Sequence, residues 1–250
     1  MSRLRVKWLG RNVPYDTGLM AMQRAAEAFH QKKEGAENTL FLLEHEDVIT
    51  TTHQGGHHFL RTNPEALATD GIQISEAARG GDVTFHGKGQ LVGYPVIRLP
   101  FMEGPPAGRV DILHYLRTLE GALVQTCNDL NLPGVHTQKD MTGVWVRPPE
   151  TMGREAKLIA IGVGVKRGVT RHGFAFNLHT PLERFTKHIV PCGLENKAVT
   201  SLERALPSNE AQIPPLPQIC RIIADHLAQG LNLETPPSPD FEAIPASLEL

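Results

Sequence analysis

Apolar residues recur at helical spacing in three long stretches of the chain. They predict helices at residues 15–31, 110–130 and 216–227, and Asp16 or Thr17 stands near the start of the first. The second stretch has the clearest pattern, and its expected buried face consists of Ile112, Leu116, Leu119, Leu123 and Leu130. Cys127 and Cys220 lie on or beside the apolar stripes of the second and third stretches, so both are most simply core residues.

Shorter apolar runs between these helices predict β-strands. A short helix would follow Asn63-Pro64, and another would begin near Thr200, which has capping-box spacing to Glu203. The turn Lys166-Arg167-Gly168 predicts an antiparallel hairpin between the two longest runs. The expected strands are residues 5–10, 39–44, 47–52, 72–75, 91–99, 142–146, 157–165 and 169–178.

Alternation gives the two faces of strand 157–165 different character. One face carries little bulk, which leaves room for a slender apolar group to lie against it; its residues are Leu158, Ala160, Gly162 and Gly164. Lys157 begins the opposite, apolar face. Its ammonium could be partly desolvated, which lowers the pKa of a lysine and suits proton transfer, or it could simply extend to water.

The composition is that of an ordinary globular protein, with 250 residues, 40% of them hydrophobic and 21% charged. No apolar run is long enough to span a bilayer, and no apolar stretch follows the basic N-terminus to form a secretory signal. Three cysteines are too few for a disulfide scaffold and indicate a reducing compartment. These features predict a cytoplasmic protein with no membrane partner.

The charge is unevenly distributed along the chain. A net charge of −2 argues against a general nucleic-acid binder. Residues 139–197 hold ten Lys and Arg against five Asp and Glu, whereas residues 203–250 hold two against seven. The basic middle segment would suit an acidic protein partner, and it would equally suit a solvated face with no partner.

Cys192 differs from the two cysteines on helices. It lies between Pro191, which fixes its own φ, and Gly193, which tolerates unusual backbone angles, so it is expected on a turn. A substrate could approach a cysteine there. The alternative is a small residue that fills a gap under a loop.

Residues 79–90 form the richest polar stretch of the chain, with four glycines around an arginine, an aspartate, a histidine and a lysine. Such a loop exposes backbone N–H groups to a ligand, or it is a glycine-rich hairpin with a solvated tip. It matches neither a Walker A loop nor a dinucleotide fingerprint. His53 and His57 have a spacing that invites a metal site, but the glycines between them argue against one, and no metal is expected.

Four blocks of the sequence together resemble the lipoyl(octanoyl) transferase family. They are Arg79-Gly-Gly-Asp-Val-Thr-Phe-His-Gly-Lys-Gly-Gln-Leu-Val-Gly-Tyr-Pro, Lys157-Leu-Ile-Ala-Ile-Gly-Val, His172-Gly-Phe-Ala-Phe-Asn-Leu and Ile189-Val-Pro-Cys-Gly-Leu, in the family's order and spacing. The resemblance implies an α/β (α+β) fold with a mixed, largely antiparallel sheet flanked by helices, as in biotin and lipoate protein ligases. It covers about residues 8–227, which implies one catalytic domain at 1–230 and a Pro-rich acidic tail at 231–250, expected to be flexible.

The resemblance also implies the activity and the partners. The family moves an octanoyl group from octanoyl-acyl carrier protein to a specific lysine of lipoyl domains, in 2-oxoacid dehydrogenase complexes and the glycine cleavage H protein. This chain would act as a monomer, without a cofactor and without ATP, since transfer from thioester to amide is downhill. Thr50-Thr-Thr-His53 departs from the family's common Thr-Leu-Gly, so the edge of the pocket is expected to differ.

The same resemblance assigns roles to individual residues. Cys192 would be the nucleophile that forms an acyl-thioester, and Lys157 would favour its thiolate and shuttle protons. A bulky side chain at Ala160 or Gly162 should then shorten the preferred acyl chain. The implied substrate-binding residues are Arg79, Gly80, Gly81, Asp82, Val83, Thr84, Phe85, His86, Ala160, Ile161, Gly162, His172, Gly173 and Phe174.

Three other functions stay open at this point. An ATP-dependent lipoate-type ligase on the same fold would need an acyl-adenylate site and no cysteine nucleophile. An acyl-binding or lipoyl-domain-binding module would not need both Lys157 and Cys192. An amidotransferase that takes octanoyl from one lipoyl protein to another also uses a cysteine, and the sequence does not separate it from the first assignment.

Overall fold

A mixed β-sheet forms the centre of the chain in the computed structural model, which describes residues 2–52, 56–103, 108–190, 198–206, 213–246 and 248. Its strand order is β1-β2-β6-β9-β8-β10, and β7 also pairs with β8. The β1–β2 and β8–β10 pairs are parallel, and the other pairs are antiparallel. The strands are β1 (Leu4–Val13), β2 (Asn38–His45), β6 (Gln90–Val96), β7 (Val144–Val146), β8 (Ala156–Lys166), β9 (Val169–Asn177) and β10 (Ala198–Val199).

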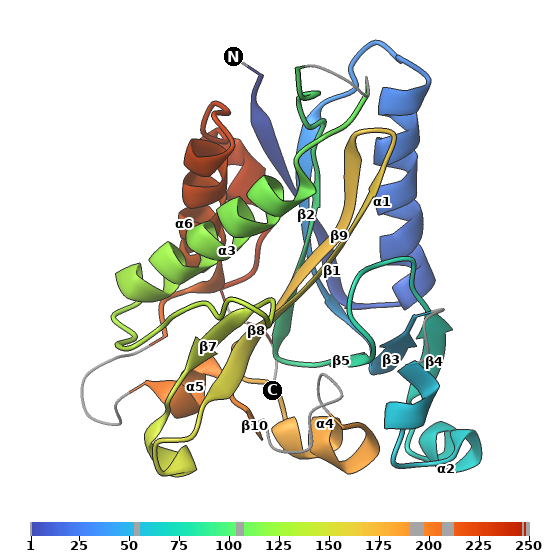
Figure 1. Cartoon of the computed structure of the whole chain (residues 1–250), viewed down its shortest axis with the longest axis vertical. Helices are drawn as coiled ribbons and strands as arrows, with labels where there is room; N and C mark the ends of the chain where they lie inside the picture. Colours follow the sequence, from blue (N-terminus) through green and yellow to red (C-terminus); the bar gives the residue numbers. More distant parts are fainter. Residues whose placement is uncertain are drawn as a thin grey trace.

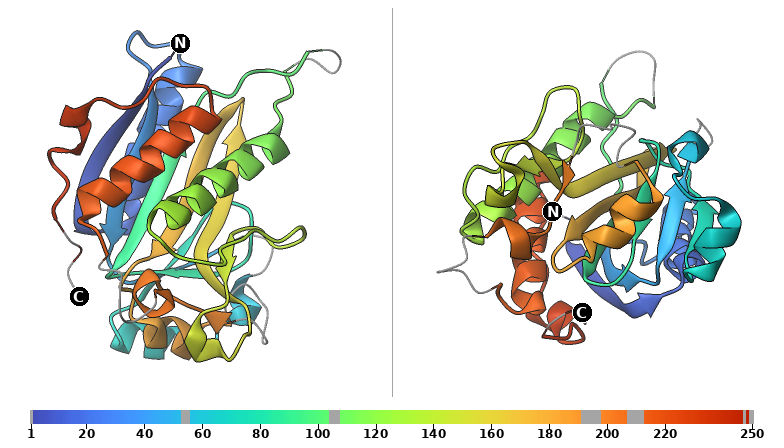
Figure 2. Two further views of the ribbon diagram at one scale, coloured as in Figure 1. Left: turned by 90° about the vertical axis from the view of Figure 1, so that its left-hand side faces the viewer. Right: turned by 90° about the horizontal axis from the view of Figure 1, so that it is seen from below.

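Helices cover both faces of this sheet (Figure 1). Helix α1 (Tyr15–His30) lies on one face, and α3 (Ile112–Asp129) and α6 (Leu216–Gly230) lie side by side on the other, as Figure 2 also shows. Because both faces are covered, the central strands β2 and β6 are buried along their whole length, and their sequences are almost continuously apolar. The predicted mixed, largely antiparallel sheet flanked by helices is confirmed.

The predicted face of α3 is only partly buried. Leu119, Leu123 and Leu130 are in the core, as expected. Ile112 belongs to the first turn of the helix and remains 46% exposed. Leu116 lines a cavity, described below.

A smaller sheet lies at one end of the large one, with strand order β4-β3-β5. Its strands are β3 (Val48–Thr51), β4 (Gln73–Glu76) and β5 (Thr84–His86), and the 3₁₀ turn η1 (Gly56–Phe59) and helix α2 (Pro64–Thr69) connect β3 to β4. Asn63 caps α2, since its side chain accepts a hydrogen bond of 2.8 Å from the amide of Ala66. The expected short helix after Asn63-Pro64 is therefore present.

The helix expected near Thr200 begins slightly later. Helix α5 (Leu202–Ala205) is capped by Ser201, whose hydroxyl accepts from the amide of Arg204. Thr200 instead continues the line of β10, and its amide donates to the carbonyl of Lys157 at 3.0 Å. Helix α4 (Leu182–His188) precedes this region in the chain.

The segment after α6, expected as a flexible tail, packs against the core in the structure. Phe241, Ile244 and Leu248 are buried in the main apolar cluster. In the 3₁₀ turn η4 (Ser238–Phe241), Asp240 accepts a hydrogen bond of 2.8 Å from the amide of Val6 and pairs with Arg5 at 3.0 Å. A few apolar residues and one buried carboxylate thus fix a segment whose Pro-rich, acidic composition suggests disorder.

Cys127 and Cys220 are fully buried, as the apolar stripes predict. Burial raises the pKa of both thiols well above the ordinary range, because the interior disfavours a thiolate. Neither cysteine is therefore suited to nucleophilic chemistry. None of the helices in the described ranges is long and apolar enough to cross a membrane.

Candidate active site

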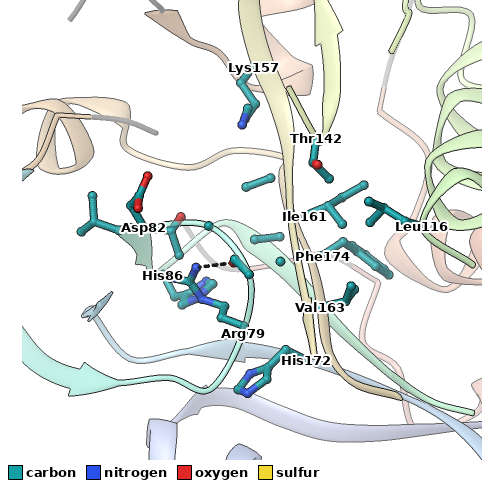
Figure 3. A pocket seen from close by; sticks show the side chains of 18 of the residues that line it. Arg79, Asp82, His86, Leu116, Thr142, Lys157, Ile161, Val163, His172 and Phe174 are labelled. Atoms are coloured by element: carbon teal, nitrogen blue, oxygen red, sulfur yellow. Dashed lines mark hydrogen bonds between the residues drawn. The ribbon is translucent and has the colours of Figure 1, made fainter. Parts of the chain in front are cut away.

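A cavity of about 430 Å³ lies along one edge of β8. β7 pairs only with residues 156–159 of β8, so beyond Ile159 no described strand lies beside this edge. Figure 3 shows Lys157 at one end of the cavity and His172 at the other, with Arg79, Asp82 and His86 on one side of the strand. Ile161 and Phe174 lie on its other side, toward α3.

Most of the residues that the sequence assigns to the site meet around this cavity. The glycine-rich loop, β8 and β9 each contribute a block, although these segments are far apart in the sequence. The predicted residues in its wall are Arg79, Gly80, Gly81, Asp82, Val83, Thr84, His86, Lys157, Ala160, Ile161, Gly162, His172, Gly173 and Phe174.

The glycines of β8 let the glycine-rich loop approach the strand closely. The loop crosses this face of the strand, and the amide of Gly80 donates to the carbonyl of Val163 at 2.9 Å. A Cβ atom at Gly162 would lie 2.8 Å from the carbonyl oxygen of Gly80, and one at Gly164 would lie 2.7 Å from that of Ala78. The lack of bulk at these glycines therefore allows two backbones to approach each other. Of the small-residue face, Ala160 and Gly162 also border the cavity.

Arg79 holds the loop on the smaller sheet. Its guanidinium donates to the carbonyl and to the hydroxyl of Thr50, at 3.0 and 2.7 Å, and to the carbonyl of Gly80 at 3.1 Å. The hydroxyl of Thr52 donates to the carbonyl of Gly81 at 3.1 Å. These bonds give the glycine-rich loop a fixed path along the cavity.

A chain of hydrogen bonds joins His86 to the strand that carries Lys157. The Nδ1 of His86 lies 2.8 Å from the Oε1 of Gln90, whose Nε2 donates to the Oδ1 of Asn177 at 2.9 Å. The Nδ2 of Asn177 donates to the carbonyl of Thr200, and the amide of Thr200 donates to the carbonyl of Lys157, each at 3.0 Å. This network of hydrogen bonds therefore fixes the position of His86 relative to the backbone of Lys157.

The direction of these bonds fixes the protonation of His86. The Nε2 of Gln90 also donates to the carbonyl of Phe85, so its Oε1 must accept, and the proton of the His86 ring is on Nδ1. Burial, followed by the charge on His45, lowers the pKa of His86 to about 3. His86 is thus a neutral ring whose Nε2 is an acceptor.

Buried aromatic rings lie at the far end of the cavity. The hydroxyl of Tyr94 donates to the Nε2 of His45 at 2.7 Å, because the Nδ1 of His45 bonds to the carbonyl of Val13 at 2.8 Å. Burial lowers the pKa of His45 to about 4 and raises that of Tyr15 to about 12. Both groups are therefore neutral at neutral pH.

His172 belongs to the same end of the cavity. Its φ of 56° is left-handed, and its amide lies 2.8 Å from the Sδ of Met22 on α1. Its ring lies edge-on to Tyr94. Burial, and then the charge of Arg79, lowers the pKa of His172 to about 4, so this ring is also neutral at neutral pH.

Phe85 is the described residue of the predicted set that does not line the cavity. Its side chain is buried with Ile49, Leu67 and Ile72 under the smaller sheet. The alternation of β5 explains this position, because Phe85 points away from Thr84 and His86.

Several residues of the cavity wall carry no signal in the sequence that marks them as site residues. Tyr94 stands inside one of the family blocks without a role, and Val163 and Ala175 adjoin assigned residues. Tyr15 and Leu116 appear in the sequence as ordinary helix residues, and no pattern marks the loop before β7. The missed residues are Tyr15, Tyr94, Leu116, Asp140, Met141, Thr142, Val163 and Ala175.

Cys192 and His53 lie outside the described residues. The described neighbours on either side of Cys192 have defined positions: the amide of Val190 donates to the carbonyl of Phe59 at 2.8 Å, and Val199 pairs with Lys157. Among the described residues, no group of His, Cys, Asp and Glu side chains could hold a metal ion.

Comparison with known proteins settles the family. The family described as "Lipoyl protein ligase A/B catalytic domain" matches residues 18–228. This chain belongs to that family. An octanoyltransferase from Acidobacterium capsulatum is 44% identical over 203 residues, which cover 80% of this chain and 79% of that protein. The predicted membership in the lipoyl(octanoyl) transferase family is confirmed, and the chain is an acyltransferase.

Solved structures agree on the fold. A bipartite lipoate protein ligase from Thermoplasma acidophilum is 15% identical and superposes with a TM-score of 0.67, covering 98% of this chain and 91% of that chain. A biotin protein ligase from Aquifex aeolicus is 10% identical with a TM-score of 0.51, covering 91% of this chain and 70% of that chain. The predicted fold of biotin and lipoate protein ligases is thus confirmed.

Proposed function

We propose that this acyltransferase moves an octanoyl group from octanoyl-acyl carrier protein to a lysine of lipoyl domains, through a thioester on Cys192. The observation that carries the proposal is the cavity along β8, with Lys157 at its end and Val199, which follows the Cys192 segment, paired to Lys157. The octanoyltransferases to which this chain is similar support octanoyl as the transferred group.

In the first step, the thiolate of Cys192 attacks the thioester carbonyl of the donor. The new carbon–sulfur bond forms on Cys192, the old one breaks, and the carrier's sulfur leaves as a thiol with a proton from the Lys157 ammonium. A lysine ammonium beside a cysteine favours the thiolate, which is the role proposed for Lys157.

In the second step, the amine of the acceptor lysine attacks the thioester on Cys192. The amide forms, the Cys192 thiolate leaves, and the amine loses a proton to Lys157 or to water. Each step exchanges one bond to the acyl carbon for another, and the second replaces a thioester by a more stable amide. Neither step needs ATP.

The wall of the cavity is suited to an acyl chain. On the side of α3 it includes the apolar residues Leu116, Ile161 and Phe174, and on the side of the glycine-rich loop Arg79 and His86 are bonded to protein partners. An alkyl chain could lie along the apolar side of this wall. Lipoyl domains as acceptors agree with the family match and with the lipoate ligase fold.

The decisive test is the intact mass of the purified protein after mixing with octanoyl-acyl carrier protein in the absence of ATP. We expect a hydroxylamine-sensitive octanoyl adduct that is absent in Cys192→Ser. The matched control is Cys127→Ser, which should keep the adduct because the Cys127 thiol is buried. Absence of an adduct without ATP, together with product from octanoate and ATP, would assign the chain to the ligase class instead.

The same experiment separates the amidotransferase alternative. If an octanoylated H protein loads Cys192 faster than octanoyl-acyl carrier protein does, the donor is a lipoyl protein. We expect the carrier protein to be the faster donor.

A further inference from the structure

Trp145 lies directly beneath the ammonium of Lys157. The Nζ of Lys157 is 4.7 Å from the centre of the Trp145 ring, within the range of a cation–π interaction. Trp145 is fully buried, whereas Lys157 is half-buried at the wall of the cavity. The ammonium of Lys157 therefore lies over the face of a buried indole ring.

A β-bulge creates this arrangement. On β7 and β8, Val144 pairs with Ile159, but the next residue, Trp145, pairs with Lys157 because the register shifts by one residue. Without the shift, Trp145 would stand opposite Leu158. A bulge re-aims a side chain at a local cost in pairing, and here it brings the indole under the ammonium.

The indole has a fixed orientation. Its Nε1 donates to the carbonyl of Met141 at 3.2 Å, and the backbone of Trp145 exchanges two hydrogen bonds of 2.9 Å with His136. Gly143 lies close to the stem of the lysine, since a Cβ there would be 3.3 Å from the Cε of Lys157. The amide of Gly143 donates to the buried Oε1 of Glu120 at 3.0 Å. These bonds fix the indole ring and the backbone segment that lies beside the stem of Lys157.

The partner of this ammonium within the described residues is a neutral ring rather than a carboxylate. A carboxylate in contact would favour the cation and also cancel its field. An aromatic face favours the cation and leaves its charge available to an anion on the other side.

We infer that Trp145 is a positioning residue that holds the ammonium of Lys157 at the end of the cavity, so that the lysine offers a positive charge to the anionic groups of acyl transfer. This inference rests on the proposed function. It adds a residue that neither the sequence motifs nor the cavity wall identifies.

Other charged and titratable groups face the same cavity. Arg79, Asp82 and His86 do so from the glycine-rich loop, and Asp140 does so from the segment before β7. Tyr15, Tyr94 and His172 lie at the far end, and Glu120, behind Gly143, is engaged by Arg117. A measurement must therefore report on Lys157 itself and vary only the ring beneath it.

Fluorinated tryptophans meet this need, because fluorine weakens the attraction of the ring for a cation and changes its volume little. The chain has two tryptophans, so the series is made in Trp8→Phe, in which the mono-, di- and trifluorinated residues occupy position 145 alone. The readout is the rate of acetylation of Lys157 by acetic anhydride as a function of pH, followed by peptide mass spectrometry. The same series in Trp145→Phe, where fluorine enters only at Trp8, is the matched control.

We expect the midpoint of Lys157 labelling to fall with each added fluorine, by roughly half to one pH unit over the series. The basic limb of the pH–rate profile for octanoyl transfer should fall with it, and the control series should not move. A labelling midpoint that is unchanged across correctly folded members of the series would overturn the inference.

Failure of the proposed function has a different signature. Full transfer activity in Lys157→Gln would remove the lysine from the reaction, whatever the labelling shows. The labelling series would still decide whether Trp145 stabilises the cation, since it needs no turnover. Thermal unfolding of each fluorinated protein confirms that a change in labelling does not come from a loosened core.

Discussion

The two ends of the cavity differ in how their polar groups are satisfied. At the end formed by His172 and Tyr94, with His86 nearby, burial keeps both histidines uncharged, and hydrogen bonds join His86 and Tyr94 to protein partners. At the other end, Lys157 presents a cation over an indole. The rings at the first end are neutral, whereas the second end holds the ammonium of Lys157. Chemistry is therefore expected at the lysine end, and shape selection along the rest of the cavity.

The largest expected effect comes from removing the charge at the lysine end. Lys157→Gln should lower kcat/KM for octanoyl transfer by about 10²- to 10⁴-fold, the usual contribution of a group that moves protons or stabilises charge. Lys166→Gln is the matched control, since Lys166 is exposed at the other end of the same strand. Steady-state kinetics with both variants test the contrast. Equal kcat/KM values for Lys157→Gln and Lys166→Gln would show that the charge of Lys157 has no role in the reaction.

The buried histidines at the neutral end should make the free energy of unfolding depend on pH. The pKa values of His45, His86 and His172 are depressed to about 4, 3 and 4, below the ordinary value of 6.5. Below pH 6.5 these three histidines therefore bind protons in the unfolded chain but not in the native state. Stability is fully present above pH 6.5 and is lost as the pH falls toward 4, by up to roughly 4 kcal/mol per pH unit for three protons.

Urea unfolding between pH 7.5 and 4.5 measures this slope. His86→Gln should reduce the slope by about a third, since one proton no longer contributes. His226→Gln is a suitable control, because His226 is only partly buried and its Nε2 bonds to the Oδ2 of Asp129 at 2.8 Å. A slope that is the same in His86→Gln as in the unmodified protein would mean that the buried histidines do not carry it.

The comparison also shows what a sequence can and cannot predict here. Three of the four family blocks correspond to the glycine-rich loop, β8 and β9, and the structure brings these segments to one cavity. Periodicity predicted the hairpin β8–β9 because its strands alternate cleanly. It could not predict the bulge that places Trp145 under Lys157, because a register shift depends on two strands at once.

The same limit explains why the sequence could not predict that the glycine-rich loop crosses β8. Gly162 and Gly164 looked like an empty face for a ligand, and the loop backbone fills part of that space. The packed segment after α6 is a second case, since Asp240 finds its partners on β1, at the other end of the chain. Contacts between distant segments leave no local pattern.

An intermediate effect is expected from the support of the lysine end. Glu120→Ala removes a buried acceptor from the amide of Gly143 and a partner from Arg117. It should lower the free energy of unfolding by about 2 kcal/mol, because a buried donor loses its acceptor. It should lower kcat/KM by roughly tenfold, because the backbone segment beside Lys157 is no longer held in place. Glu120→Gln keeps one acceptor oxygen and should recover most of the activity. If Glu120→Ala keeps full activity despite its lower stability, the loop does not position the lysine.

The smallest effect concerns chain length along the wall between the two ends. Ala160 and its cross-strand partner Ala175 both line the cavity, so Ala160→Leu adds bulk inside it. Each methylene that loses its burial costs about 0.8 kcal/mol, so octanoyl transfer should fall roughly tenfold while hexanoyl transfer is kept. The comparison variant is Gly162→Ala, whose Cβ would press on the carbonyl of Gly80. It should displace the loop and slow all chain lengths alike. A chain-length profile that is unchanged in Ala160→Leu would show that the acyl chain does not pass this part of β8, and the wall would then serve only to hold the loop.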